Sequence, residues 1–317
     1  MTIVVAADLV EPVVAGLVGG IDVDDGPTER QLAVLAAVVA HLWRRPDLDV
    51  RTVRPLRPDE VVREIGDAEV RHRTMELLVM LELCRHPQTL TQVTRVEEYA
   101  AALGVESHAL DIIRTWIDDG TERATADYDR FYAEVLPELS EPAFRSKYLR
   151  LDEPDHALAR QLRAFHELPS DTLGYAYIEF YRRNQLVLPG DDTHMPAHYV
   201  SHDMNHVIAG YEPTGPGEIA LGAFTLAMQD NDANWLQFMT NLLIHEGGML
   251  KHGEIMPKAE TLSRPGATEL LGEALERGSR CTADFSQAEH LTMVDWPLAD
   301  VRAHFGVPAA DLLGRGM

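Results

Sequence analysis

The chain has 317 residues, of which 51 are acidic and 28 are basic, so that its formal net charge is −23. Such an acidic surface repels phosphate backbones, which argues against nucleic-acid binding. Only Cys84 and Cys281 are present, which fits a reducing compartment, and no apolar run is long enough to cross a bilayer. We therefore expect a cytoplasmic protein without a transmembrane segment, in which any association with a membrane is peripheral.

The N-terminal region mixes apolar and acidic residues and reaches an aspartate-rich loop at 22–26. Aspartates before a helix can hold a cation, but they are also typical helix caps, and the capping interpretation is favoured. From Thr28 to Leu42 the apolar residues recur at intervals of three and four. This pattern predicts a helix that ends before Pro46.

Further amphipathic runs continue to about residue 135. Their periodicity predicts helices over 69–85, 93–103, 110–117 and 128–135, and strand-like alternation is absent. Pro137 and Pro142 enclose a junction that is too short to be a flexible linker. The sequence therefore predicts an all-α protein of two packed helical domains, 1–137 and 138–317.

The second half is also helical in pattern. Helices are predicted over 157–165, 173–181, 219–228 and 235–249, and another begins at His198. Asp171 or Thr172 would cap the second of these helices, and a turn lies within 186–196. The last two runs are apolar on most sides, so they either form core or line an apolar cavity. The candidate cavity residues are Phe224, Met228, Trp235, Phe238 and Met239.

The helix that begins at His198 carries the main candidate site. His202 and His206 are four residues apart, so they project from one helical face, with Asp203 nearby. After Gly210 and a Pro/Gly-rich turn, Glu218 falls in the first turn of the next apolar run. A short antiparallel return would bring Glu218 to the histidines, and two imidazoles with two carboxylates can hold one divalent ion. Solvated or core histidines are equally compatible with this spacing.

This motif is His-Asp-x-x-His, eleven further residues and Glu, and it resembles the signature of the coenzyme Q biosynthesis protein 4 family of ubiquinone synthesis. The likeness includes the segment 168–177 before the motif and the segments 217–220, 274–278 and 301–307 after it. The resemblance covers residues from about 140 to 317.

The resemblance implies that His202, Asp203, His206 and Glu218 bind a divalent metal, zinc or iron. It also implies an enzyme of quinone biosynthesis, or of related aromatic or prenylated metabolites, that acts as a lyase. The implied reaction is oxidative decarboxylation or hydroxylation of an aromatic ring carbon, in which a ring carboxylate is replaced by hydroxyl.

Two residues one turn before the motif, His198 and Tyr199, are candidates for proton transfer or substrate orientation; the alternative is a place on the helix surface or in the core. Family members often carry arginines just before the first histidine, whereas this chain reads Ala-His-Tyr-Val-Ser at 197–201. An anionic substrate group bound by those arginines would have no equivalent partner here.

Residues from about 20 to 137 resemble tellurite-resistance TerB-like domains. The resemblance lies in the Asp-Gly before the first helix, the leucine-rich central helix and the Ala-Ala-Leu-Gly-Val segment ending at 105. It implies a second metal site at Asp24, Asp25 and Glu29.

Two other functions stay open. One is a non-catalytic, metal-stabilised, lipid-binding scaffold that gathers biosynthetic enzymes, with the N-terminal half as docking module; the other is a metal-dependent hydrolase. Structural zinc sites are usually cysteine-rich and closed, which favours catalysis. His245-Glu246 and His252 do not form a zinc-protease motif, because the second histidine comes seven residues later rather than four. The sequence is compatible with a homo-oligomer.

Overall fold

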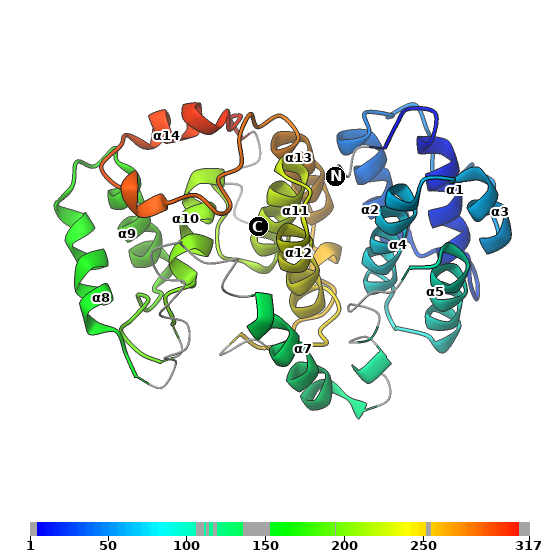
Figure 1. The fold of residues 1–317 in the computed structure, drawn as a ribbon, viewed down its shortest axis with the longest axis horizontal. Coiled ribbons are helices and arrows are strands. Elements are labelled where there is room, and N and C mark those ends of the chain that lie inside the picture. Colours follow the sequence, from blue (N-terminus) through cyan, green and yellow to red (C-terminus); the bar gives the residue numbers. More distant parts are fainter. Residues whose placement is uncertain are drawn as a thin grey trace.

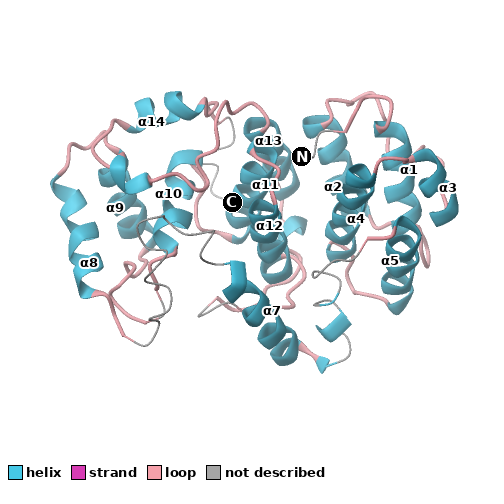
Figure 2. Ribbon diagram, in the orientation of Figure 1, coloured by secondary structure: helices cyan, strands magenta, loops and turns pink. Residues whose placement is uncertain are grey.

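The computed structural model describes residues 5–105, 111, 114–116, 119–135, 153–193, 195–251 and 255–310. Helices dominate throughout this part of the chain (Figure 2). Extended pairing within it is limited to two isolated bridges, Thr172 with Pro297 and Gly247 with Ala259. The all-α prediction is confirmed. Half of the predicted helix at 110–117 and the whole junction at 137–142 lie outside the described residues.

In the N-terminal part of the chain, the helices up to residue 103 form a compact group, whereas the helix at 121–135 lies apart from them (Figure 1). The helices of this part are α1 (Val10–Ile21), α2 (Glu29–Ala37), the π-helical η1 (Val38–Leu42), α3 (Pro58–Glu64), α4 (Ala68–Leu83), α5 (Leu90–Leu103) and α7 (Thr121–Val135). The predicted helices at 28–42, 69–85 and 93–103 are present. The sequence did not indicate α1, because this helix is buried on nearly every side and so lacks a polar face to reveal the 3.6-residue period.

The C-terminal helices carry the candidate site. They are α8 (His156–Arg163), η3 (Ala164–Glu167), α9 (Leu173–Asn184), α10 (Tyr199–Ala209), α11 (Gly215–Met228), α12 (Asp232–His245), η4 (Thr261–Ser263), α13 (Ala267–Gly278), η5 (His290–Thr292) and α14 (Leu298–Phe305). Thr172, not Asp171, caps α9. The predicted helix at 235–249 ends at His245, because Gly248 adopts a left-handed φ of 66°.

The helix α11 lies at the centre of the molecule, packed against α12 and α13, while α10 packs against α9 and α14 (Figure 1). Contacts of α13 with α2 and η1, and of α12 with α4, join the two groups of helices into one apolar core. Ion pairs also cross this boundary; in two of them Arg73 Nε donates to Asp230 at 3.0 Å, and Arg30 Nη1 donates to Glu246 at 3.2 Å. The division at residue 137 stays a prediction.

No helix in the described part of the chain offers an apolar stretch of 18 residues, the length that a membrane crossing would need.

Candidate metal centre

Two glycines set the tight connection between α10 and α11. Gly210 ends α10 in the left-handed conformation, with a φ of 87°. A Cβ on Gly217 would lie 2.0 Å from the carbonyl oxygen of Glu212, so only glycine lets the chain turn back at this point. Thr214 then caps α11 by accepting a hydrogen bond from Gly217 N–H. The result is that Glu218, in the first turn of α11, faces the histidines of α10.

Three electron-donating atoms converge at this hairpin. Nε2 of His202 lies 3.1 Å from Oε2 of Glu218, and Nε2 of His206 lies 3.2 Å from both of these atoms. Bonds of about 2.0–2.1 Å to a tetrahedral zinc ion would set neighbouring ligand atoms about 3.3 Å apart. We call His202, His206 and Glu218 the His-His-Glu cluster, and its spacing matches the donor set of a single divalent ion.

The other nitrogen of each imidazole is held by a separate group. His206 is fully buried, its Nδ1–H donates to the carbonyl of Tyr211 at 3.0 Å, and its ring stacks on Phe180. Nδ1 of His202 lies 3.0 Å from the side-chain amide of Gln237 on α12. By rotation, this amide can present either its NH₂ group or its oxygen. Both imidazoles can therefore keep a lone pair on Nε2 directed into the cluster, with the proton on Nδ1.

The charges within the cluster stabilise one another. Burial would raise the pKa of the Glu218 carboxyl, but His206 and His202 hold this pKa well below its usual range. Burial lowers the pKa of His202, yet the hydrogen bond and the negative charge of Glu218 outweigh it, so that the pKa is raised. The cluster thus favours a negatively charged Glu218 facing a positive charge.

Asp203 lies beside the cluster on α10. Its carboxylate accepts a hydrogen bond from the hydroxyl of the buried Tyr181. His202, Asp203 and His206 can each present a ligand atom such that all three atoms lie within 4.8 Å of one another. The structure therefore brings together the four predicted ligands. Glu218 is in direct contact with both imidazoles, and the Asp203 carboxylate is held in place by its hydrogen bond from Tyr181.

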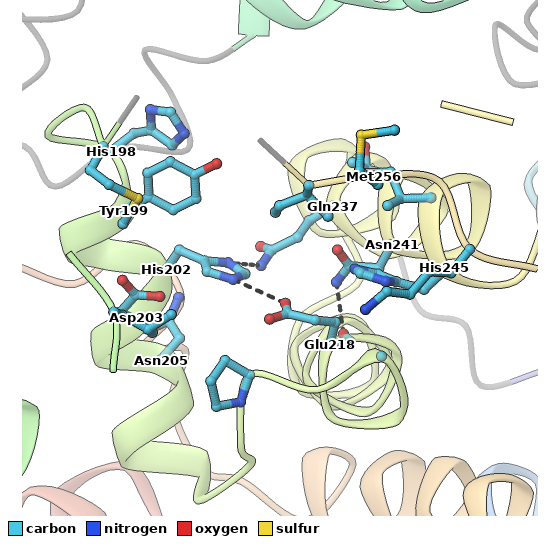
Figure 3. Close-up of a pocket in the computed structure, with 18 residues that line it drawn as sticks. His198, Tyr199, His202, Asp203, Asn205, Glu218, Gln237, Asn241, His245 and Met256 are labelled. Atoms are coloured by element: carbon cyan, nitrogen blue, oxygen red, sulfur yellow. Dashed lines mark hydrogen bonds and ion pairs between the residues drawn. The ribbon is translucent and has the colours of Figure 1, made fainter. Parts of the chain in front are cut away.

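The cluster opens into a cavity of about 570 Å³ (Figure 3). Its walls combine the polar residues of α10, α11 and α12 with the apolar side chains of Leu186, Met195, Ile255 and Met256. The volume lies in the range of small-molecule sites. Leu186 and Met256 are 39% and 60% exposed, so apolar side chains also stand at the outside of this cavity.

His198 and Tyr199 both line the cavity, and their role in proton transfer or substrate orientation stays a prediction. Their rings stack with centroids 4.3 Å apart, and the Tyr199 ring meets His202 edge-on.

The five predicted apolar cavity residues do not line this cavity. Phe224 packs against Tyr211 and Phe285, and Trp235 donates its Nε1–H to Asp230 in the core. Phe238 and Met239 are buried, and Met228 is partly buried against the same core. The reason is that the apolar face of α12 points into the protein, so that its polar face is left for the cavity.

The residues of the second predicted site are held separately. Asp24 accepts hydrogen bonds from Arg85 at 3.1 Å and Thr89 at 2.9 Å, whereas Glu29 pairs with Arg51 at 2.7 Å. Clusters of three metal-binding side chains within the described residues are confined to His202, Asp203 and His206. Asp24, Asp25 and Glu29 accordingly do not converge.

Several site residues were not predicted from the sequence. Gln237, Asn241 and His245 of α12 all line the cavity, and Asn241 Nδ2 donates to the carbonyl of Glu218 at 2.7 Å. These polar residues follow each other at intervals of four in an otherwise apolar helix, a pattern that the sequence does contain. Lys258, which also lines the cavity, lies in a loop where no period could reveal it.

The sequence matches no protein-family model and no curated protein. Among solved structures, it is similar to a candidate ubiquinone biosynthesis protein from Nostoc punctiforme, with 17% identity and a TM-score of 0.35. The alignment covers 74% of this chain and 98% of the other.

Proposed function

We propose that the His-His-Glu cluster binds one divalent metal ion and that the adjoining cavity is the active site of a metal-dependent enzyme. The observation that carries the proposal is the convergence of three electron-donating atoms within 3.2 Å at the wall of a ligand-sized cavity. Two imidazoles and one carboxylate are the protein ligands of catalytic zinc sites and also of non-haem iron sites. Asp203 would either bind the metal as a fourth ligand or accept a hydrogen bond beside it.

The proposed substrates are aromatic or prenylated metabolites of quinone type. This class is supported by the cavity itself, in which polar groups surround the cluster and apolar side chains form the remaining wall. A bound cation would supply stabilisation of negative charge on a carboxylate or ring oxygen. Tyr211 and Gln237 would orient the two imidazoles, and Tyr199 would orient the substrate above His202.

The specific reaction that we propose is the replacement of a ring carboxylate by hydroxyl. The carboxylate leaves as carbon dioxide, and the hydroxyl oxygen comes from dioxygen. A reductant supplies two electrons, and three protons are consumed: one completes the ring hydroxyl and two form the water in which the second oxygen atom leaves. Zinc has no redox chemistry, whereas iron does, so the identity of the metal decides between this reaction and a hydrolysis.

The test begins with the purified protein and its metal content. We expect about one equivalent of zinc or iron per chain in the wild type and almost none in the double variant His202→Ala/His206→Ala. His156→Ala is the matched control, because this histidine lies at an exposed position of α8. The activity assay follows release of carbon dioxide from hydroxylated aromatic acids under dioxygen with a chemical reductant.

The proposal is overturned in two ways. Equal metal content in the wild type and the double variant would remove the metal site. Full metal occupancy without any turnover of carboxylated phenols, in either the zinc or the iron form, would remove the oxidative decarboxylation.

A further inference from the structure

The end of α12 and the segment 255–260 form one wall of the cavity. Lys258 N–H donates to the carbonyl of Ile244 at 2.8 Å, and Glu260 N–H donates to the carbonyl of Glu246 at 3.0 Å. Between them, Gly247 and Ala259 form an isolated bridge. The backbone of the segment is therefore fixed against the helix end, and Lys258 is held beside His245.

His245 is a buried imidazole, and one of its ring nitrogens has no hydrogen-bond partner among the described residues. The residue is 5% exposed and lines the cavity, and its Nδ1 is enclosed without a hydrogen-bond partner in the described structure. Because Nδ1 is enclosed, the nitrogen that a ligand can reach is Nε2. Buried polar atoms are almost always hydrogen-bonded, and exceptions call for an explanation. Figure 3 places His245 with Asn241 on the α12 side of the cavity, across from His202.

Lys258 is an exposed residue that supplies a cation to this cavity. Acidic residues outnumber basic ones by 51 to 28, and even the solvent-facing Arg51 and Arg182 form ion pairs with carboxylates. No described residue forms an ion pair with Lys258, although it is the one lysine or arginine among the residues that line the cavity. A protein with this excess of negative charge therefore keeps a positive charge available at its candidate active site.

We propose that Lys258 and His245 form a subsite that recognises an anionic group of the substrate, a carboxylate or a phenolate. The ammonium group would provide the charge, and the imidazole would donate one N–H to the same group. This inference rests on the proposed function only in taking the cavity as a substrate site. In the family that the sequence resembles, arginines often precede the first histidine. This chain lacks them, and the inference assigns the substrate-binding cation to Lys258, which lies on a different segment.

The electrostatics agree with this arrangement. Burial lowers the pKa of His245, Glu218 opposes the effect and Lys258 adds to it. The imidazole is thus neutral near pH 7, and it lies within electrostatic reach of both the cluster and the lysine. A group bound between Lys258 and His245 would leave the rest of an aromatic ring beside the His-His-Glu cluster.

The test compares two probes that share one aromatic ring system, the anion 2-naphthoate and its neutral methyl ester, methyl 2-naphthoate. Their affinities are measured by fluorescence titration for the wild type, Lys258→Met, His245→Phe and the matched control Lys251→Met, whose lysine is exposed and outside the cavity. Each protein is measured as purified and after chelation with EDTA, and its metal content is recorded.

We expect the wild type to prefer the acid over the ester, and Lys258→Met to weaken acid binding about tenfold while ester binding is unchanged, as loss of a charge-assisted hydrogen bond implies. His245→Phe should weaken acid binding several-fold, whereas Lys251→Met should have no effect. Equal effects of Lys258→Met and Lys251→Met would overturn the subsite. So would an acid preference that EDTA abolishes and Lys258→Met does not change. A Lys258-dependent preference in a protein that binds no metal would uphold the subsite while the proposed metal function fails.

Discussion

The N-terminal helices and the α10–α11 hairpin both place carboxylates near helix starts, but they balance those charges differently. Asp24 faces Arg85, and Glu29 faces Arg51. Glu218 instead faces two imidazole nitrogens, and no described lysine or arginine forms an ion pair with it. The protein thus supplies an arginine to each carboxylate in the first region and two imidazoles to the carboxylate in the second.

This difference is the reason why we propose a metal centre at the hairpin and not at the acidic N-terminal loop. Carboxylates near a helix start are common and stabilise the helix dipole without any ion. What distinguishes the hairpin is that three donor atoms approach one another without a cation from the protein between them. The variants below remove or replace a charged or hydrogen-bonding partner in one of the two regions, beginning with the largest expected effect.

The largest effect is expected for His206→Ala. The imidazole contributes Nε2 to the cluster and is fully buried against Phe180. Its loss should lower metal affinity by more than the roughly 10–100-fold that is typical when an outer hydrogen-bonding residue is removed. Competition with a chromophoric chelator measures this affinity. Retention of wild-type affinity would show that the three atoms do not share an ion.

The second prediction creates an unbalanced charge where the protein now has a pair. Arg73 and Asp230 are both 2% exposed, and Arg73→Met leaves this aspartate buried without its cation. We expect the free energy of unfolding to fall by about 3–5 kcal/mol in urea titrations. Arg182→Met breaks an exposed pair with Glu179 and should leave the free energy of unfolding almost unchanged. Equal losses in the two variants would contradict our view of the buried pair.

The third prediction concerns an acid in the N-terminal helices whose carboxylate has no hydrogen bond to any described residue. Glu82 is fully buried, neither of its carboxylate oxygens has a hydrogen-bond partner in the described structure, and burial raises its pKa to about 8. Its stability contribution is complete below the unfolded pKa near 4.5 and is lost as the pH rises toward 8.

Glu82→Gln should therefore raise the free energy of unfolding by about 2–3 kcal/mol at pH 7 and by almost nothing at pH 4. Denaturant titrations at both pH values measure the difference, with the exposed Glu64→Gln as control. A pH-independent difference would mean that Glu82 ionises normally.

The smallest effect is expected at Gln237, which holds Nδ1 of His202. Gln237→Ala should weaken metal binding about tenfold, whereas Gln237→Glu should retain or increase the affinity, because a carboxylate can also accept the Nδ1 proton. Calorimetric metal titration of both variants, with the exposed Gln229→Ala as control, tests this orienting role. Equal losses for Ala and Glu would show that only the packing of Gln237 matters.

The sequence was sufficient for the fold class and for the main cluster. Helical spacing placed His202 and His206 on one face, and the glycines and prolines of the turn indicated a tight return that would bring Glu218 back to them. Both inferences use short-range geometry, which periodicity and turn chemistry determine directly.

The cavity could not be predicted in the same way. Apolar periodicity located the buried face of α12, and the sequence offered Trp235 and Phe238 as cavity residues although they form core. The cavity belongs to the polar face of that helix and to Lys258, which comes from a loop. Packing between segments that are distant in the sequence decides which face of a helix borders a cavity. The periodicity of a single sequence does not contain this information.

X-ray absorption spectroscopy of the zinc-loaded protein tests the central claim most directly. We predict nitrogen and oxygen ligands at about 2.0–2.1 Å, with the outer-shell signal of two imidazoles in the wild type and of one in His206→Ala. A spectrum that indicates sulfur ligands, or one that is the same in the wild type and His206→Ala, would contradict the account.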